Sequence, residues 1–236
     1  MKQAIVIIGG YNSIWTAYLK MARELQALTG LPAIAVPLMP WHWWRAERAK
    51  DATGVLQRLD ETMAWARRRH QAGFNILVGH SAGGLIARLY LSDRPVWNRI
   101  YGGLEHVSMV VTLGSPHCNS MDHRTGWFLA DEANRLAPGT PYAGHVRYHT
   151  VAGRYAFGDP SGKWGERRAH RSYAFFCGQG DTWGDGTVPL ECACLDGAEG
   201  VVLSGVAHSR KNGAAWYGSS AEIIRRWWPD GVIHDR

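Results

Sequence analysis

The stretch that decides the fold is FNILVGHSAGGLIARLYL, residues 74–91. Its first part is a short apolar run, which predicts a buried strand, and its second part repeats apolar residues at helical spacing. Gly79 and Gly83 leave room for the strand and the helix to approach each other closely. The turn between them holds Ser81, in the setting where a sharp strand-to-helix turn lifts a nucleophilic serine above a sheet. The alternative is that Ser81 is a small residue in a tight turn without a chemical role.

Outward from this stretch, short apolar runs alternate with longer amphipathic ones. The apolar runs predict buried strands at residues 4–10, 31–38, 74–80, 106–116, 146–155 and 200–205. The amphipathic runs predict helices at residues 15–30, 45–72, 81–93 and 214–228. Strands that alternate with helices are typical of the α/β class. We therefore expect about six mostly parallel strands flanked by helices.

The length of 236 residues suits one domain with a sizeable core, so residues 1–236 are interpreted as a single domain. The alternation breaks at residues 117–145 and 156–184, which are rich in Gly, Pro, Asp and His. Long irregular loops inside a compact domain are usually functional. Residues 117–145 are therefore a candidate lid, and residues 156–184 are expected to form an irregular insertion.

A serine hydroxyl is a weak nucleophile without a base, and the base is expected on a loop after the last strand. GVVLSGVAHS places His208 there, and this position singles it out among eleven histidines. The acid is expected between the serine and the histidine, where GDTWGDGTVPLE places Asp185 in a glycine-flanked loop. Asp181 and Asp196 are the alternatives, and Asp185 could also serve an ordinary Asp-Gly turn.

An oxyanion formed during attack needs two backbone N–H donors. One is expected from Ala82, the residue after the serine, and the other from the loop after the first strand. IIGGYNS supplies that loop, so Tyr11 is the expected donor and Asn12 the alternative. The same loop does not match the GxGxxG pattern of dinucleotide-binding proteins.

With these residues assembled, the chain resembles the α/β-hydrolase superfamily, and within it the lipase and esterase branch. Four segments carry the likeness: IIGGY, GHSAGG, VTLGSPH, and GDGTVP followed by GVAHS. TLGSPH is similar to a segment of bacterial lipases and phosphatidylinositol-anchor deacylases, and GDGTVP to the acid-bearing loop of lecithin–cholesterol-type acyltransferases. The resemblance implies a compact α/β-hydrolase fold with loop or lid insertions. One departure is Gly9-Gly10, where this branch usually has His-Gly, so a side chain that buttresses the loop is missing.

The assembled residues predict a serine carboxylic-ester hydrolase, a lipase or esterase. Ser81, Asp185 and His208 would act as the triad, and Tyr11 and Ala82 as the oxyanion hole. This chemistry forms an acyl-enzyme and needs no metal or organic cofactor. One alternative is an acyltransferase with the same triad, and a second is a catalytically silent binding protein of the same fold. Thioesterase and peptidase activities stay open, because the same triad serves them.

The chain has twelve tryptophans, several of them near the expected site. Aromatic side chains there could bind acyl chains or lie at a lipid interface. The candidates for substrate binding are Trp41, Trp43, Trp44, Trp127 and Trp183. Core packing is the alternative for the WHWW group. These residues favour a small-molecule or lipid-like acyl ester as substrate, with peripheral contact to a lipid surface.

The net charge of +6 comes mostly from arginines in short runs mixed with acids and apolar residues. Such runs are typical of solvated helix faces and do not favour nucleic-acid binding.

The four cysteines lack zinc-ligand spacing and are interpreted as reduced thiols packed near the core. No targeting signal and no apolar stretch of membrane-spanning length is visible, which predicts a cytoplasmic protein. The sequence does not indicate an oligomeric state.

Overall fold

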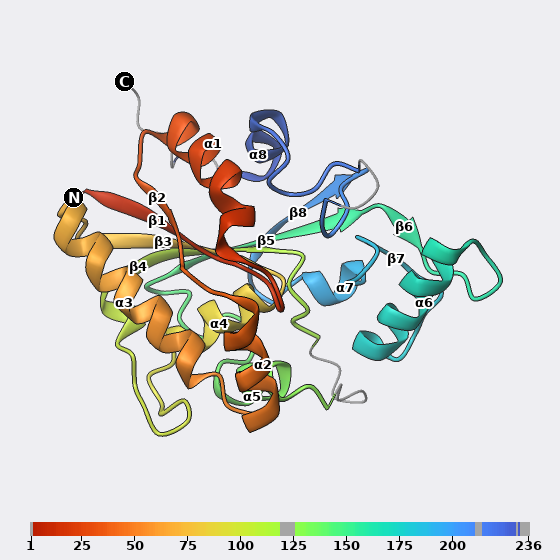
Figure 1. Cartoon of the computed structure of the whole chain (residues 1–236), viewed down its shortest axis with the longest axis horizontal. Coiled ribbons are helices and arrows are strands. Elements are labelled where there is room, and N and C mark those ends of the chain that lie inside the picture. The colour runs from red at the N-terminus through yellow and green to blue at the C-terminus, as the bar shows by residue number, and fades with distance from the viewer. Residues whose placement is uncertain (1, 119–125, 211–213, 230, 232–236) are drawn as a thin grey trace.

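The centre of the molecule is a six-stranded sheet in the order β2-β1-β3-β4-β5-β8, and each neighbouring pair is parallel. The computed structural model describes residues 2–118, 126–210, 214–229 and 231, and Figure 1 shows its ribbon. The strands are β1 (Gln3–Ile8), β2 (Ala33–Ala35), β3 (Phe74–His80), β4 (Val107–Leu113), β5 (Arg147–Arg154) and β8 (Glu199–Ser204). The predicted α/β class, with about six mostly parallel strands, is confirmed.

Helices cover both faces of this sheet. On one face lie α1 (Leu19–Thr29), which follows the 3₁₀ turn η1 (Trp15–Tyr18), and α8 (Ala221–Trp227). On the other face lie α2 (Pro40–Ala49), α3 (Thr53–His70), α4 (Ala82–Tyr90) and α5 (Phe128–Leu136). A second 3₁₀ turn, η2 (Gly103–Glu105), precedes β4.

Strand β3 is buried on both faces because it lies inside the sheet. Ile76, Leu77 and Val78 are each fully buried. Successive side chains of a strand point to opposite faces, so Leu77 joins the core under α3 and α4, whereas Ile76 and Val78 join the core under α1 and α8. Full burial of each of these side chains stabilises the fold by about 1.5–3 kcal/mol. Because an inner strand is buried on both faces, its sequence is a continuous apolar run, and the run at residues 74–80 predicts this strand correctly.

Two of the predicted helices are shorter than expected. The predicted helix at residues 45–72 is divided, because Lys50 adopts a left-handed conformation with φ 55° at the end of α2. The Asp51 carboxylate then accepts a hydrogen bond from the Thr53 backbone N–H at 2.6 Å and begins α3. The predicted helix at residues 214–228 is reduced to α8, whose first turn is capped by the Ser220 hydroxyl.

The candidate lid at residues 117–145 contains α5, and residues 119–125 of it lie outside the described residues. Helix α5 packs against α4 through its apolar face. The buried residues of that face are Leu129, Ala130, Ala133 and Leu136. This part of the candidate lid is therefore built into the core and does not lie loosely over the sheet.

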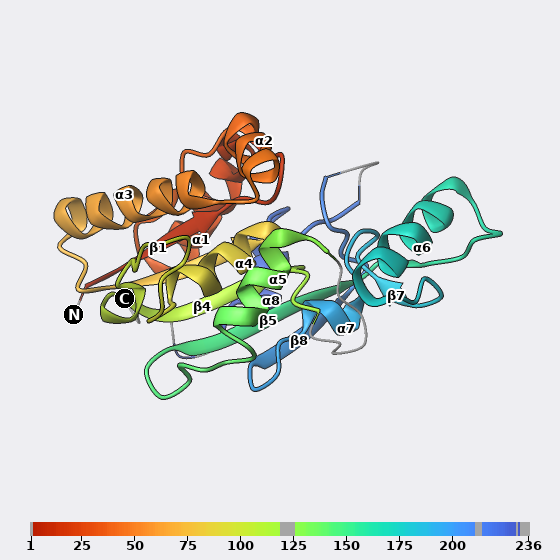
Figure 2. The same ribbon diagram turned by 90° about the horizontal axis from the view of Figure 1, so that it is seen from below.

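The expectation of an irregular insertion at residues 156–184 is wrong. This stretch forms α6 (Trp164–Cys177) and a short antiparallel hairpin of β6 (Ala156–Phe157) and β7 (Trp183–Gly184). The four-residue helix α7 (Leu190–Ala193) follows. Helix α6 buries only Ala169 and Tyr173 fully, so its apolar face is too narrow to give a clear helical pattern in the sequence. Figures 1 and 2 show α6 beside β6 and β7 at one end of the molecule.

Arg88 of α4 is a buried cation that ties three segments together. Its guanidinium donates to the Ala137 carbonyl at 2.6 Å and to the Asn134 Oδ1 at 2.9 Å, both at the end of α5. It also lies 3.3 Å from His117 Nδ1. Burial lowers the pKa of Arg88 to about 10, so the side chain stays charged at neutral pH. The carbonyl end of a helix carries partial negative charge, which stabilises this cation.

We expect Arg88→Met to lower the free energy of unfolding by about 2–3 kcal/mol, because the substitution keeps the volume but leaves buried acceptors without a donor. Urea unfolding of wild type and variant measures this difference. The matched control is Arg58→Met, which removes an exposed ion pair to Glu61 and should change stability by about 0.5 kcal/mol or less. Equal losses in the two variants would contradict a structural role for Arg88.

Candidate active site

Ser81 lies in a strained turn between β3 and α4. Its φ of 54° and ψ of −124° are rare for a residue with a side chain, and such backbone strain costs of order 1–3 kcal/mol. The glycines beside it are required by space. A Cβ added to Gly83 would lie 2.2 Å from the Ile8 carbonyl oxygen, and one added to Gly79 would lie 2.5 Å from Gly84 Cα. The sequence GHSAGG therefore folds into the sharp turn that its glycines permit.

His208 and Asp185 are joined by a charge-assisted hydrogen bond. His208 Nδ1 lies 2.7 Å from Asp185 Oδ2, and a carboxylate oxygen accepts, so Nδ1 carries the proton. The other ring nitrogen of His208, Nε2, then holds a free lone pair. The Asp185 carboxylate is almost fully buried and takes three more hydrogen bonds, from the Thr187 and Val188 N–H groups and from the Tyr217 hydroxyl.

Two unused backbone donors lie near Ser81. The N–H groups of Tyr11 and Ala82 donate to no residue within the part of the chain that the structure describes. The loop that carries Tyr11 lies close to the serine. A Cβ added to Gly10 in this loop would lie only 2.9 Å from Ser81 Cβ. The alternative donor Asn12 has φ 59°, and its side-chain oxygen accepts a hydrogen bond from Trp44 Nε1 at 2.9 Å.

A chain of buried hydrogen bonds links the Gly10 loop to the loop of His208. The Gly10 N–H donates to the Tyr18 hydroxyl at 2.8 Å, and that hydroxyl lies 2.8 Å from His80 Nδ1. His80 Nε2 lies 2.9 Å from the His208 carbonyl oxygen, which can only accept. His80 Nε2 therefore carries the proton, and Nδ1 accepts from Tyr18. The His80 and His208 rings are 4.8 Å apart between centroids.

The sequence pattern does not point to Tyr18. Tyr18 occupies part of a predicted helix, and nothing in that pattern indicates a partner 62 residues later in the chain. Burial, and then the neighbouring His208, lower the pKa of His80 to about 3, so His80 is neutral at physiological pH.

Ser81 and His208 line one cavity of about 790 Å³. It is also lined by the Gly10–Ser13 loop, by Trp127, and by Arg168, Phe175 and Phe176 of α6. Thr187 and Trp216 complete its wall near the histidine. Tyr, Trp and Phe side chains make up about a third of the residues that line this cavity, and the charged residues Glu47, Arg168 and Arg210 also line it.

The five candidate tryptophans have different places in the structure. Trp127 lines the cavity of Ser81, and Trp183 lines a neighbouring cavity. Trp43 is 1% exposed and packs in the core under α3, so its predicted role in substrate binding is wrong. Trp41 and Trp44 are exposed side chains that line neither cavity. The WHWW group thus divides between core and surface, because successive residues of α2 point in different directions.

The rival acids do not approach the serine. The Asp181 carboxylate is exposed and lies 3.2 Å from His170 Nε2. Asp196 is exposed and does not line the cavity. Among the described residues, no cluster of three or more His, Cys, Asp or Glu side chains is arranged to hold a metal ion.

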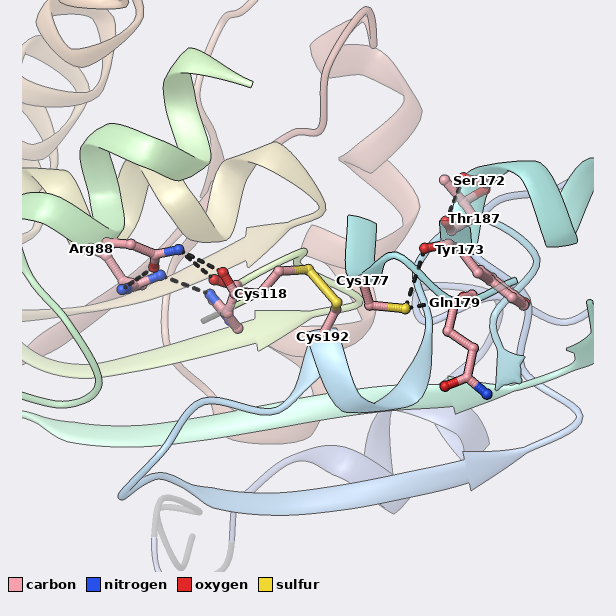
Figure 3. The surroundings of a disulfide bond; sticks show 10 residues. Arg88, Cys118, Ser172, Tyr173, Cys177, Gln179, Thr187 and Cys192 are labelled. Carbon is pink, nitrogen blue, oxygen red and sulfur yellow. Dashed lines mark hydrogen bonds between the residues drawn. A yellow bond between two sulfur atoms is a disulfide. The ribbon is translucent and has the colours of Figure 1, made fainter. Parts of the chain in front are cut away.

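The interpretation of the cysteines as reduced thiols is wrong for two of them. Cys118 and Cys192 form a disulfide, with Cα atoms 4.4 Å apart and a sequence separation of 74. Figure 3 shows this bond beside Arg88, with Cys177 nearby but separate. The thiols of Cys177 and Cys194 are free. The pairing joins the segment after β4 to α7, two parts that are distant in sequence.

We expect the stability of the protein to depend on pH through His80. The folded state keeps His80 neutral down to about pH 3, whereas the unfolded state binds a proton below about pH 6.5. The contribution of His80 to the free energy of unfolding has its full value above pH 6.5. It is lost as the pH falls towards 3, at up to about 1.4 kcal/mol per pH unit. Urea unfolding of wild type and His80→Gln at pH 7, 6 and 5 measures the difference. Parallel stability curves for the two proteins would contradict this assignment.

No protein-family model and no curated protein matches the chain. Solved structures do match. The product of the gene lin2722 of Listeria innocua is 15% identical, with a TM-score of 0.52 over 99% of this chain and 98% of that one. Phospholipase PlaB of Legionella pneumophila is 13% identical, with a TM-score of 0.51 over 89% of this chain and 54% of that one. Tomato methylketone synthase I, solved with 2-tridecanone, is 18% identical, with a TM-score of 0.37 over 57% and 47%.

The chain thus spans about half the length of the phospholipase and of the synthase. At these identities the likeness concerns the architecture. Combined with the parallel sheet order and the serine turn after β3, it shows that this chain has the α/β-hydrolase fold.

Proposed function

We propose that the protein is a serine carboxylic-ester hydrolase, a lipase or esterase, with Ser81, His208 and Asp185 as its catalytic residues. One observation carries the proposal. The strained serine shares a cavity with a histidine whose Nδ1–H is held by a buried carboxylate, and the backbone N–H groups of Ala82 and Tyr11 have no acceptor among the described residues. A base that is oriented by a third group is the mark of an activated nucleophile.

In the proposed reaction, His208 Nε2 accepts the proton of Ser81 Oγ as the oxygen attacks the ester carbonyl carbon. The N–H groups of Tyr11 and Ala82 donate to the negative oxygen of the tetrahedral intermediate. His208 then gives the proton to the leaving alkoxide, and the C–O bond of the ester breaks. A water molecule loses a proton to His208 and its oxygen attacks the acyl carbon. His208 then returns that proton to Ser81 Oγ as the bond between Oγ and the acyl carbon breaks and the carboxylic acid leaves.

Asp185 serves this reaction by orientation and by charge. Its four hydrogen bonds hold the carboxylate in one position, and one of them fixes the His208 tautomer. Burial and the nearby Asp185 raise the pKa of Tyr217 well above its ordinary value, so the Tyr217 hydroxyl stays a donor. The negative Asp185 stabilises the imidazolium that forms when His208 takes the serine proton.

The aromatic wall of the cavity supports an acyl ester as substrate. Tyr11, Trp127 and Phe176 give an apolar surface beside Ser81, which suits the hydrocarbon part of an acyl group. Transfer of the acyl group to an alcohol uses the same residues, and product analysis with an added alcohol distinguishes it from hydrolysis.

We also propose that residues 1–236 act as one domain around this site.

The disulfide bears on the compartment of the protein. No helix among the described residues has the length and apolarity to cross a bilayer. The cytoplasmic location expected from the sequence stays a prediction, and the Cys118–Cys192 bond weighs against it, because disulfides persist mainly in oxidising compartments. An oxidising compartment is the location that this bond favours.

We expect a fluorophosphonate probe to label the folded wild-type protein on Ser81, as read by mass spectrometry of the labelled peptide. Ser81→Ala should lose the label and at least about 10³-fold of the hydrolysis of p-nitrophenyl decanoate. The control Ser161→Ala, in an exposed turn, should be labelled like wild type. A folded wild-type protein that takes no label would instead support the silent binding protein.

We expect Tyr18→Phe to lower kcat by about ten- to a hundredfold, because it removes the hydroxyl between the Gly10 N–H and His80 and loosens the Tyr11 donor. KM should change little, since Tyr18 is buried and the loss concerns the transition state. Steady-state kinetics measure both values, with circular dichroism as the control for folding. A change in KM alone would show that Tyr18 does not support the oxyanion loop.

A further inference from the structure

A second cavity, of about 710 Å³, has His208 in its wall but not Ser81. Arg168, Thr187, His208 and Ser209 line both this cavity and the cavity of the serine. The two spaces therefore meet at the histidine. In the proposed reaction, His208 protonates the leaving oxygen, so the alcohol part of the ester has to lie on the histidine side of the serine. The second cavity is in the position to receive it.

The walls of this second cavity combine aromatic rings with cations. Trp164 and Trp183 lie on it together with Lys163 and Arg168. The Arg154 guanidinium stacks over Trp183, with Cζ 4.7 Å from the ring centroid. This arrangement adds positive charge beside the cavity.

Two carboxylates also line this cavity, those of Glu166 and Asp185. The Glu166 carboxylate accepts from the Lys163 backbone N–H at 2.5 Å, which also fixes the start of α6. The Asp185 carboxylate is held by four donors and faces His208. Arg168 has no carboxylate or hydrogen-bond acceptor among the residues that the structure describes. The centroid of the Trp164 ring lies 5.8 Å from the Arg168 Cζ.

Arg168 is also held at a fixed place relative to the catalytic residues. The Ser172 hydroxyl of α6 donates to the Thr187 carbonyl at 2.6 Å, and the Gly186 N–H donates to the Tyr173 hydroxyl at 2.8 Å. The Thr187 carbonyl and the Gly186 N–H both belong to the loop that carries Asp185. Helix α6 is thereby fixed to that loop, and Arg168 with it.

We propose that the second cavity binds the alcohol part of the substrate, that this part carries an anionic phosphate group, and that Arg168 holds the phosphate. An arginine fork that is half-buried and makes no ion pair with a carboxylate among the described residues suits a phosphate, because its N–H groups match two phosphate oxygens. The substrate class is then an acyl ester of a phosphorylated alcohol. This inference rests on the proposed ester hydrolysis.

The test compares two esters with the same acyl chain, 1-decanoylglycerol and 1-decanoylglycerol 3-phosphate, both as monomers in solution. Wild type should hydrolyse the phosphate ester with the higher kcat/KM. Arg168→Gln should raise KM for the phosphate ester about ten- to a hundredfold, the effect of losing a charge-assisted hydrogen bond, and change the neutral ester less than about threefold. Arg171→Gln, on the same helix but lining neither cavity, is the matched control and should behave as wild type.

Equal losses for the two esters in Arg168→Gln, or equal rates for them in wild type, would overturn the inference and leave ester hydrolysis standing. Failure of wild type to cleave either ester would count against the proposed function. Calorimetric titration with glycerol 3-phosphate, inorganic phosphate and glycerol then tests the cavity without catalysis. Binding of glycerol 3-phosphate that is lost in Arg168→Gln supports the site. Binding of inorganic phosphate of equal strength, or no binding of either anion, overturns the assignment of this cavity to a phosphorylated alcohol.

Discussion

The close approach of α4 to β1 is the constraint on which the site depends. Gly83 lies so near the Ile8 carbonyl that any side chain there would push the helix away from the strand. Because the helix stays close, the start of α4 and the end of β1 lie against each other. The loop after β1 then reaches Ser81, and the strained backbone of Ser81 is held by the packing on both sides. A strained backbone conformation of this kind persists only where the packing around it leaves no room for a relaxed one.

The same constraint explains the use of a buried neutral histidine. His80 ends β3 and lies between the loop after β1 and the loop after β8, so it can accept from one and donate to the other. A neutral imidazole is the side chain that offers one acceptor and one donor on opposite sides of a rigid ring. Tyr18 completes the link on the side where Gly9 and Gly10 leave no side chain to support the loop. The Tyr18 hydroxyl, from η1, is thus the side-chain group that holds the Gly10 N–H.

The parts that were predictable from the sequence are those that depend on local pattern. The strands followed from apolar runs, because inner strands of a parallel sheet are buried on both faces. Their places after predicted strands also singled out Asp185 and His208, which are hydrogen-bonded in the structure, while their catalytic roles with Ser81 stay a prediction. The Tyr18–His80 link, the Cys118–Cys192 pair and the burial of Trp43 depend on distances between remote segments, which periodicity does not contain. Helix α6 was missed because it rests on few buried residues, and with it the wall that carries Arg168.

The Cys118–Cys192 bond closes a covalent ring in the chain, and the ring divides the site. Asp185 and all of α6 lie inside the ring, whereas Ser81 and His208 lie outside it. A closed loop restricts how far its members can separate when the rest of the chain opens. The carboxylate and the cavity wall therefore stay tethered to each other and to the end of β4, even when the chain around them is locally unfolded. When the site forms again, Ser81 and His208 have to pack against the segment between Cys118 and Cys192, which the disulfide keeps closed.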